Sequence, residues 1–205
     1  LSGMRLRCRH RLESPRSAAG RSFGEQDGAP QQRMGKRNWS ILGSTSKSGV
    51  EDFNLRADRT LARDMIAGQK PKWIIGSPPC TAWSILNCGL NYHKMAPELV
   101  EKRMEEGRRH LRFVASLYRG QLLRGDHFLH EHPATARSWK EPEIDAIARL
   151  AYVQCVDADQ CMFGLTTPSE HDRSIRLPAK KPTIFMTSSP QLAARLSRRC
   201  DTSHE

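Results

Sequence analysis

The residues best suited to carry out chemistry lie in one short segment, Ser77-Pro78-Pro79-Cys80, directly after the apolar pair Ile74-Ile75. The apolar pair predicts a buried strand over residues 73–76, and the strand must end before the two prolines because they have no N–H to donate. Each proline also keeps the residue before it out of the helical region, which makes the loop stiff. The sequence therefore predicts a thiol, Cys80, held at the carboxyl end of a strand, where a cysteine can act as a nucleophile.

A carboxylate follows another predicted strand, in the segment Glu131-His132-Pro133. If the two strands are parallel, both segments meet at one edge of the sheet. A thiolate and a carboxylate that face one cleft suit covalent addition to an electron-poor heteroaromatic ring, in which the carboxyl group supplies a proton or hydrogen bond to a ring nitrogen. The alternative roles are a buried structural cysteine for Cys80 and a capping or ion-paired carboxylate for Glu131.

Metal binding is a weaker interpretation of the remaining cysteines and histidines. His130 and His132 alternate on a strand and so share a face, but no third ligand stands at a recognisable spacing. Cys200-Asp201-Thr202-Ser203-His204 has the Cys-x3-His spacing, and it would need partners brought in by the fold. No metal site is predicted.

The elements that must position these residues alternate along the chain. The first predicted helix has Asn54 as its cap and Leu61, Met65 and Ile66 on its apolar face. Helices are predicted over roughly residues 56–68, 96–123, 141–150 and 190–197, and strands over roughly residues 73–76, 127–131, 151–156 and 183–187. This alternation predicts an α/β fold with a mostly parallel sheet and flanking helices.

The charge of the chain is concentrated near its beginning. The 33 Lys and Arg against 22 Asp and Glu give a net charge of +11 over 205 residues. Residues 1–37 show no apolar period and hold a basic excess, so we expect a basic disordered tail there and one domain over residues 38–205. A basic arm favours polyanions such as DNA, and a merely solvated tail is the alternative.

Cysteine usage and hydropathy point to the compartment. The six cysteines include no Cys-x-x-Cys pair, and no apolar run is long enough for a signal-peptide core or a membrane span. We therefore expect free thiols, no membrane partner, and an intracellular location, either nuclear or cytoplasmic. The oligomeric state is not predicted.

Two segments resemble motifs of a known family. Ser77-Pro78-Pro79-Cys80-Thr81-Ala82-Trp83-Ser84 resembles the nucleophile loop of cytosine-5 DNA methyltransferases, where Pro-Pro-Cys precedes a short stretch that ends in Phe-Ser. Glu131-His132-Pro133 resembles the Glu-Asn-Val or Glu-Asn-Pro motif of the same family. The closer similarity, over roughly residues 50–204, is to methyltransferase-like domains of phages and of protist retroelement-type reading frames, through stretches such as Gln160-Cys161-Met162-Phe163-Gly164 and Lys181-Pro182-Thr183.

This resemblance implies a Rossmann-like fold and a specific reaction. Cys80 would attack carbon 6 of a cytosine flipped out of DNA, and Glu131 would contact ring nitrogen 3 and the exocyclic amine. S-adenosylmethionine would supply the methyl group to carbon 5, with Asp52, Ser77 and Pro78 as the expected cofactor contacts. The expected contacts to DNA are Ser84, Arg108, Arg109 and Arg112, and the alternative for the arginines is a solvated helix face.

The chain also departs from the family pattern. The family begins with a strand and a Phe-x-Gly-x-Gly turn that holds the cofactor, and residues 1–50 contain no counterpart, so the fold is expected to be incomplete in its amino-terminal half. His132 replaces the usual asparagine, which helps to order the loop. Two functions stay open: an S-adenosylmethionine-dependent methyltransferase acting on cytosine in DNA, and a non-catalytic nucleic-acid-binding relic of a transposable element.

Overall fold

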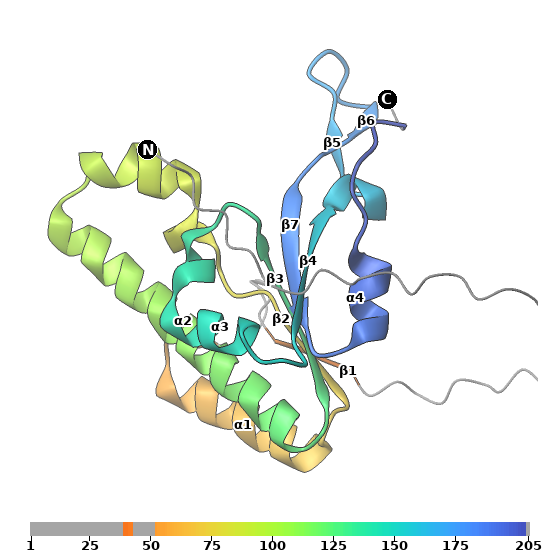
Figure 1. Cartoon of the computed structure of the whole chain (residues 1–205). Helices are drawn as coiled ribbons and strands as arrows, with labels where there is room; N and C mark the ends of the chain where they lie inside the picture. Colours follow the sequence, from red (N-terminus) through yellow and green to blue (C-terminus); the bar gives the residue numbers. More distant parts are fainter. Residues whose placement is uncertain (1–38, 43–51, 204–205) are drawn as a thin grey trace, which may run out of the picture. The chain divides into compact units, whose positions relative to one another are not determined.

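A computed structural model describes residues 39–42 and 52–203 of the chain (Figure 1). The predicted tail over residues 1–37, and with it the predicted boundary before residue 38, lies outside the described residues. The described residues combine helices with a mixed sheet, so the prediction of an α/β class is confirmed.

The main sheet has five strands in the order β1-β2-β3-β7-β4. β1 pairs parallel with β2, and β2 pairs parallel with β3, whereas β7 runs antiparallel to both of its neighbours, β3 and β4. A separate antiparallel pair, β5 and β6, projects beyond the main sheet (Figure 1). The strands are β1 (Trp39–Leu42), β2 (Trp73–Gly76), β3 (His127–Pro133), β4 (Gln154–Asp159), β5 (Thr166–Pro168), β6 (Arg176–Pro178) and β7 (Pro182–Thr187).

The prediction of a mostly parallel sheet is wrong, because only two of the five strand pairings are parallel. The reason is the connection between β4 and β7. It contains a 3-10 turn and the β5–β6 pair but no α-helix, and a chain without a crossover helix returns antiparallel to the strand it has just left. β4 and β3 still point the same way, since each is antiparallel to β7.

Within residues 52–203, four α-helices accompany the sheet, close to where helical periodicity predicts them. α2 and α3 lie on one face of the sheet and α4 lies on the other (Figure 1). A proline opens each of α2, α3 and α4, where its missing N–H costs no helical hydrogen bond. The helices are α1 (Arg56–Gln69), α2 (Pro97–Leu123), α3 (Pro142–Ala148) and α4 (Pro190–Leu196). None of the helices within residues 52–203 is both long and apolar enough to cross a membrane.

The core lies mainly between α2 and the face of the main sheet that α2 and α3 cover. Ile74 of β2 and Phe128 of β3 are fully buried, and the ring of Phe128 stacks on Tyr118 of α2 at 4.4 Å between centroids. Each such buried side chain contributes about 1.5–3 kcal/mol of hydrophobic free energy. Ile144 and Ile147 of α3 complete the core, as their helical spacing predicts.

The first helix differs from its prediction in which face it buries. Ala62 and Ile66 are buried, whereas Leu61 and Met65 are 51% and 41% exposed. The cap also differs, because the N-cap residue is Leu55 without a side-chain hydrogen bond. Ala62 is buried although it is small, and a search for large apolar residues overlooks it.

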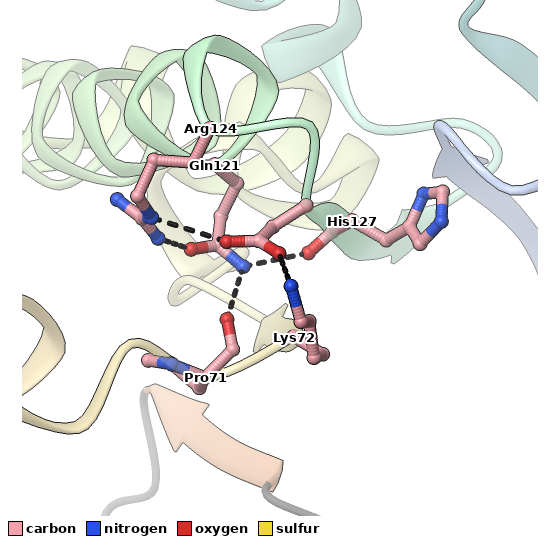
Figure 2. A network of polar contacts seen from close by, with 6 residues as sticks. Pro71, Lys72, Gln121, Arg124 and His127 are labelled. Atoms are coloured by element: carbon pink, nitrogen blue, oxygen red, sulfur yellow. Dashed lines mark hydrogen bonds and ion pairs between the residues drawn. The ribbon is translucent and has the colours of Figure 1, made fainter.

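A polar network ties the end of α2 to the first residues of β2 and β3 (Figure 2). The buried amide of Gln121 donates from Nε2 to the backbone carbonyls of Pro71 and His127, at 3.0 Å each. The Asp126 carboxylate accepts from Lys72 at 3.0 Å and from Arg124 at 3.1 Å. This network lies at the amino-terminal edge of the β2–β3 pair, and Ser77 and Glu131 lie at the opposite edge.

Candidate active site

The parallel register of β2 and β3 brings the cysteine loop to the predicted carboxylate. Gly76, the last residue of β2, pairs with His130, so Ser77 and Glu131 occupy the next positions. The Ser77 hydroxyl donates to Glu131 Oε2 at 2.6 Å. The first residue of the Ser77–Cys80 segment and the carboxylate therefore meet at one edge of the sheet, and Glu131 belongs to β3 itself rather than to the loop after it.

His132 restrains the same loop through a hydrogen bond to the backbone of Pro78. Its ring is buried, and Nε2 donates to the Pro78 carbonyl at 2.9 Å. Because a carbonyl only accepts, the proton is on Nε2, and Nδ1 accepts from the Ser138 hydroxyl. Burial lowers the pKa of His132, although its bond to Pro78 and the charge of Glu131 act in the opposite direction. A neutral histidine thus holds the proline pair at this position.

Two further side chains contact Glu131, and they come from residues next to β4 and β7 at the same edge of the sheet. Gln160 donates from Nε2 to Glu131 Oε1 at 3.1 Å and to the Thr183 hydroxyl at 3.0 Å. The ammonium of Lys181 lies 3.7 Å from the same Oε1. Sequence analysis assigned no role to these residues, although they flank β4 and β7 as polar residues at strand ends, which is the available signal. The carboxylate is therefore oriented by donors on both oxygens.

Cys80 lies where the loop turns into a short 3-10 helix, Thr81–Trp83. The Trp83 N–H donates to the Cys80 carbonyl at 2.9 Å, and the Trp83 side chain is fully buried. α2 supports this turn at Gly107, where a Cβ would lie 3.0 Å from both Ala82 and Trp83. The half-buried Cys80 forms no disulfide, and neither do the other four cysteines within residues 52–203. The backbone thus presents the thiol on an anchored turn.

The two histidines considered as metal ligands have other roles. His130 is fully buried, and its Nδ1 lies 2.9 Å from the Tyr118 hydroxyl, while both ring nitrogens of His132 bind the loop and Ser138. No group of three or more His, Cys, Asp or Glu residues in the described ranges is arranged to hold a metal ion. His204, the last member of the Cys-x3-His pattern, lies outside those ranges.

The three expected cofactor contacts, Asp52, Ser77 and Pro78, each form a hydrogen bond within the protein. The exposed Asp52 accepts from the Asn54 N–H at 2.9 Å and so shapes the turn before α1. Ser77 is bonded to Glu131, and the Pro78 carbonyl is bonded to His132. All three residues thus make contacts within the protein, and their role as contacts to S-adenosylmethionine stays a prediction.

Two of the expected DNA contacts are engaged within the protein. The Ser84 hydroxyl accepts from the Asn87 N–H at 3.2 Å and so begins the helical turn over Asn87–Asn91. The Arg108 guanidinium lies 2.9 Å from Glu101 and 3.6 Å from Glu141. Both side chains have a local structural explanation.

The other two expected contacts lie on the neighbouring face of α2. Arg112 pairs with Glu105, one of whose oxygens also lies 3.8 Å from Arg108. Arg109 has no carboxylate partner within the described residues, and it lines a cavity between α1 and α2 together with Arg112. Arg109 is thus the predicted contact whose charge stays uncompensated.

No family model, curated protein or solved structure matches this chain. The resemblance to cytosine-5 methyltransferases therefore stays a prediction that depends on the motifs. The site itself is described by its geometry: a thiol on an anchored turn, and a carboxylate oriented by Ser77, Gln160 and Lys181 at the same sheet edge. Such a pair can add a nucleophile to a ring and exchange a proton with it.

Proposed function

We propose that residues 38–205 form a Rossmann-like, cytosine-5 methyltransferase-like domain that binds a cytosine of DNA and adds Cys80 to it. The observation that carries the proposal is the 2.6 Å hydrogen bond between Ser77 and Glu131. This bond joins the loop that carries Cys80 to Glu131, the proposed partner of the ring nitrogen. Ser77 and Glu131 are 54 positions apart in the chain.

The proposed addition balances with the groups present. The Cys80 sulfur forms a bond to carbon 6, the 5,6 double bond breaks, and its electrons shift through the ring to nitrogen 3. The thiol proton moves to nitrogen 3 with Glu131 as its carrier. Each carboxylate oxygen can accept two hydrogen bonds, so Oε2 can keep Ser77 and also accept from the exocyclic amine of the base.

His132 acts here as a positioning residue. Through its bond to the Pro78 carbonyl it restrains the loop two residues before Cys80, the role that an asparagine has in the family motif. A nucleophile held within about 3–3.5 Å of its target reacts much faster than a mobile one, because the entropy of orientation is already lost.

The second candidate function is a nucleic-acid-binding relic without methyl transfer. The observation that favours it is the engagement of Asp52, Ser77 and Pro78 in contacts within the protein. Both candidates share the base-binding edge and differ in the methyl donor. S-adenosylmethionine, DNA as the partner and the intracellular location stay predictions.

The test of the shared step is covalent capture without a methyl donor. DNA that carries 2-pyrimidinone in place of cytosine offers a more electron-poor ring, and intact-mass measurement of the full chain after incubation reports the adduct. We expect an adduct with the wild type and none with Cys80→Ser. The matched control is Cys88→Ser, because Cys88 is a half-buried free thiol eight residues further on. Equal adduct formation by Cys80→Ser, or none by the wild type, would refute the proposal.

A second measurement separates the two candidate functions. Calorimetric titration with S-adenosylmethionine at millimolar concentration should release heat if the domain is a methyltransferase. With binding, DNA that carries 5-fluorocytosine should trap the wild-type protein through Cys80. Adduct formation with 2-pyrimidinone but no heat with the cofactor would leave the relic as the function.

A further inference from the structure

Four arginines converge on a cavity of about 200 Å³ between α1 and α2, away from the residues of the candidate active site. Arg59 and Arg63 are one turn apart on α1, and Arg109 and Arg112 lie on one face of α2. The lining residues are Arg59, Arg63, Arg109, Arg112, Phe113 and Ser116. Helical spacing thus directs charge from two elements into one space.

Two of these guanidinium groups are held in place by contacts. Arg59 donates from Nη1 to the carbonyls of Phe53 and Asn54, at 2.6 and 2.9 Å. Arg63 lies over the ring of Phe113, 5.0 Å from its centroid, and Phe113 in turn packs against Phe53 at 4.9 Å. The arginines therefore lose less conformational entropy on binding a ligand than free surface arginines would.

The charge around this cavity is not neutralised by the described part of the chain. Within residues 52–203, no carboxylate forms an ion pair with Arg59, Arg63 or Arg109, and only Arg112 is paired. The contrast with Arg108 is direct, because that residue lies within 4 Å of three glutamates. Arg108 of α2 is thus balanced by glutamates, whereas Arg59, Arg63 and Arg109 have no carboxylate ion-pair partner within residues 52–203.

The arginines around the cavity also act on the pKa of a neighbouring histidine, His110. His110 is flanked by residues of both helices, and burial lowers its pKa. The charge of Asp52 raises the pKa of His110, whereas Arg109 and Arg59 lower it further. An anion placed among these arginines would offset their effect on the His110 ring, which makes His110 a reporter of binding.

We propose that the cavity between α1 and α2 binds a phosphate group of a nucleic-acid backbone. Guanidinium groups bind phosphate with paired, charge-assisted hydrogen bonds, and several of them around one space suit a phosphodiester, whose two non-bridging oxygens each accept more than one hydrogen bond. The cavity is smaller than the about 300–1,000 Å³ of pockets that enclose whole small molecules, so it fits a phosphate better than an entire nucleotide. The choice of nucleic acid over free phosphate rests on the proposed function.

The experiment compares two pairs of substitutions in the full chain. Arg63→Gln with Arg109→Gln removes two charges from the cavity, and Arg56→Gln with Arg119→Gln removes two charges from exposed positions on the same helices. DNA affinity is measured by fluorescence anisotropy across a salt series, and thermal unfolding checks that both variants fold. At about 0.15 M salt we expect roughly tenfold weaker binding by the cavity variant, with a salt slope shallower by about 1–2, and under twofold change for the control.

A second arm distinguishes the source of the phosphate. Pyrophosphate is titrated into the protein while the His110 ring resonances are followed by NMR, in the wild type and in the cavity variant. A saturable shift only in the wild type, together with the DNA result above, supports the proposal. The same shift with unchanged DNA affinity of the cavity variant makes free phosphate the ligand and overturns the nucleic-acid assignment.

The remaining outcomes separate this inference from the proposed function. Equal loss of affinity in both double variants, or no loss in either, overturns the cavity as a site. Cys80→Ser should bind DNA as the wild type does, so a failed adduct with intact cavity-dependent binding refutes only the chemistry of Cys80. Adduct formation by a cavity variant with undiminished DNA affinity refutes only the phosphate site.

Discussion

The two ends of the β2–β3 pair each carry a polar network, and the two networks are built differently. At the amino-terminal end the fully buried Gln121 side chain donates to two backbone carbonyls and accepts from Arg124 (Figure 2). At the carboxyl-terminal end Glu131 accepts only from side chains, those of Ser77 and Gln160, with Lys181 nearby. The first network therefore supplies hydrogen-bond donors to backbone carbonyls, whereas the bonds to Glu131 join side chains only to one another.

The difference in exposure has the same direction. Gln121 is 0% exposed, whereas the Glu131 side chain is 18% exposed and that of Lys181 is 45% exposed. A buried amide bonded to carbonyls cannot exchange its partners without leaving them unsatisfied, which costs about 1–3 kcal/mol for each group. Hydrogen bonds between partly exposed side chains can be exchanged for water or for a ligand at little cost. The comparison indicates that one end maintains the fold and that the other end is suited to a substrate.

The largest expected effect comes from breaking the amino-terminal network. Gln121→Met keeps the volume of the side chain but leaves the carbonyls of Pro71 and His127 without their donor. We expect the free energy of unfolding to fall by about 2–4 kcal/mol, measured by urea denaturation. Gln191→Met, at an exposed position of α4, serves as the control and should change stability by under about 0.5 kcal/mol. A loss below that value for Gln121→Met would contradict a structural role.

The next effect tests the buried histidines beneath the carboxyl-terminal network. Burial lowers the pKa of His130 well below its usual 6.5, and the neighbouring His132 acts in the same direction. Because the unfolded chain then binds protons that the folded chain does not, stability is fully present above about pH 6.5 and is lost as the pH falls below that value. The urea midpoint of the wild type should decrease as the pH falls from about 7.5 to 5. The midpoint of His130→Gln should decrease less steeply over the same range. An unchanged slope in that variant would contradict the prediction, and His93→Gln, an exposed histidine, is the control.

The contrast between the two ends also explains how much of the fold could be predicted. Helical periodicity and proline positions predict both ends of all four α-helices to within two residues, because those signals are local. β1 is not among the predicted strands, since four residues show too little alternation to predict a strand. The direction of β7 depended on the absence of a helix between β4 and β7, which local patterns reveal only after the pairing is known.

The candidate site divides in the same way. The sequence could bring Ser77 and Glu131 together because Ser77 directly follows β2 and Glu131 lies near the carboxyl end of β3, the parallel neighbour of β2. Gln160 and Lys181 could not, because they reach Glu131 only through the antiparallel insertion of β7 between β3 and β4. The internal pairing of Arg108 with glutamates from α2 and from the start of α3 likewise depends on tertiary contacts.

A smaller effect separates charge from backbone bonding at the amino-terminal end. Burial raises the pKa of Asp126, but the hydrogen bonds and charges of Lys72 and Arg124 outweigh it, so the net pKa lies below the usual 3.8. The stability that Asp126 contributes is therefore present above about pH 3.8 and is lost as the pH falls through the folded pKa. Asp126→Asn should be less stable than the wild type at pH 7 and approach it near pH 2, in denaturation curves across that range. Parallel curves would contradict this, and Asp64→Asn on the exposed side of α1 is the control.

The smallest expected change in stability comes from the carboxyl-terminal network, where the functional consequence should be largest. Ser77→Ala removes the hydroxyl that orients Glu131, and because Ser77 is exposed the free energy of unfolding should fall by only about 0.5 kcal/mol or less. The rate of adduct formation with 2-pyrimidinone DNA should nevertheless decrease about tenfold or more, since the carboxylate loses its fixed position relative to the Cys80 loop. Thr81→Ala, another exposed hydroxyl of the same loop, should leave both quantities nearly unchanged. If Ser77→Ala lowered stability as much as Gln121→Met does, or left the adduct rate untouched, the two ends of the strand pair would not differ in the way that their partners and exposure indicate.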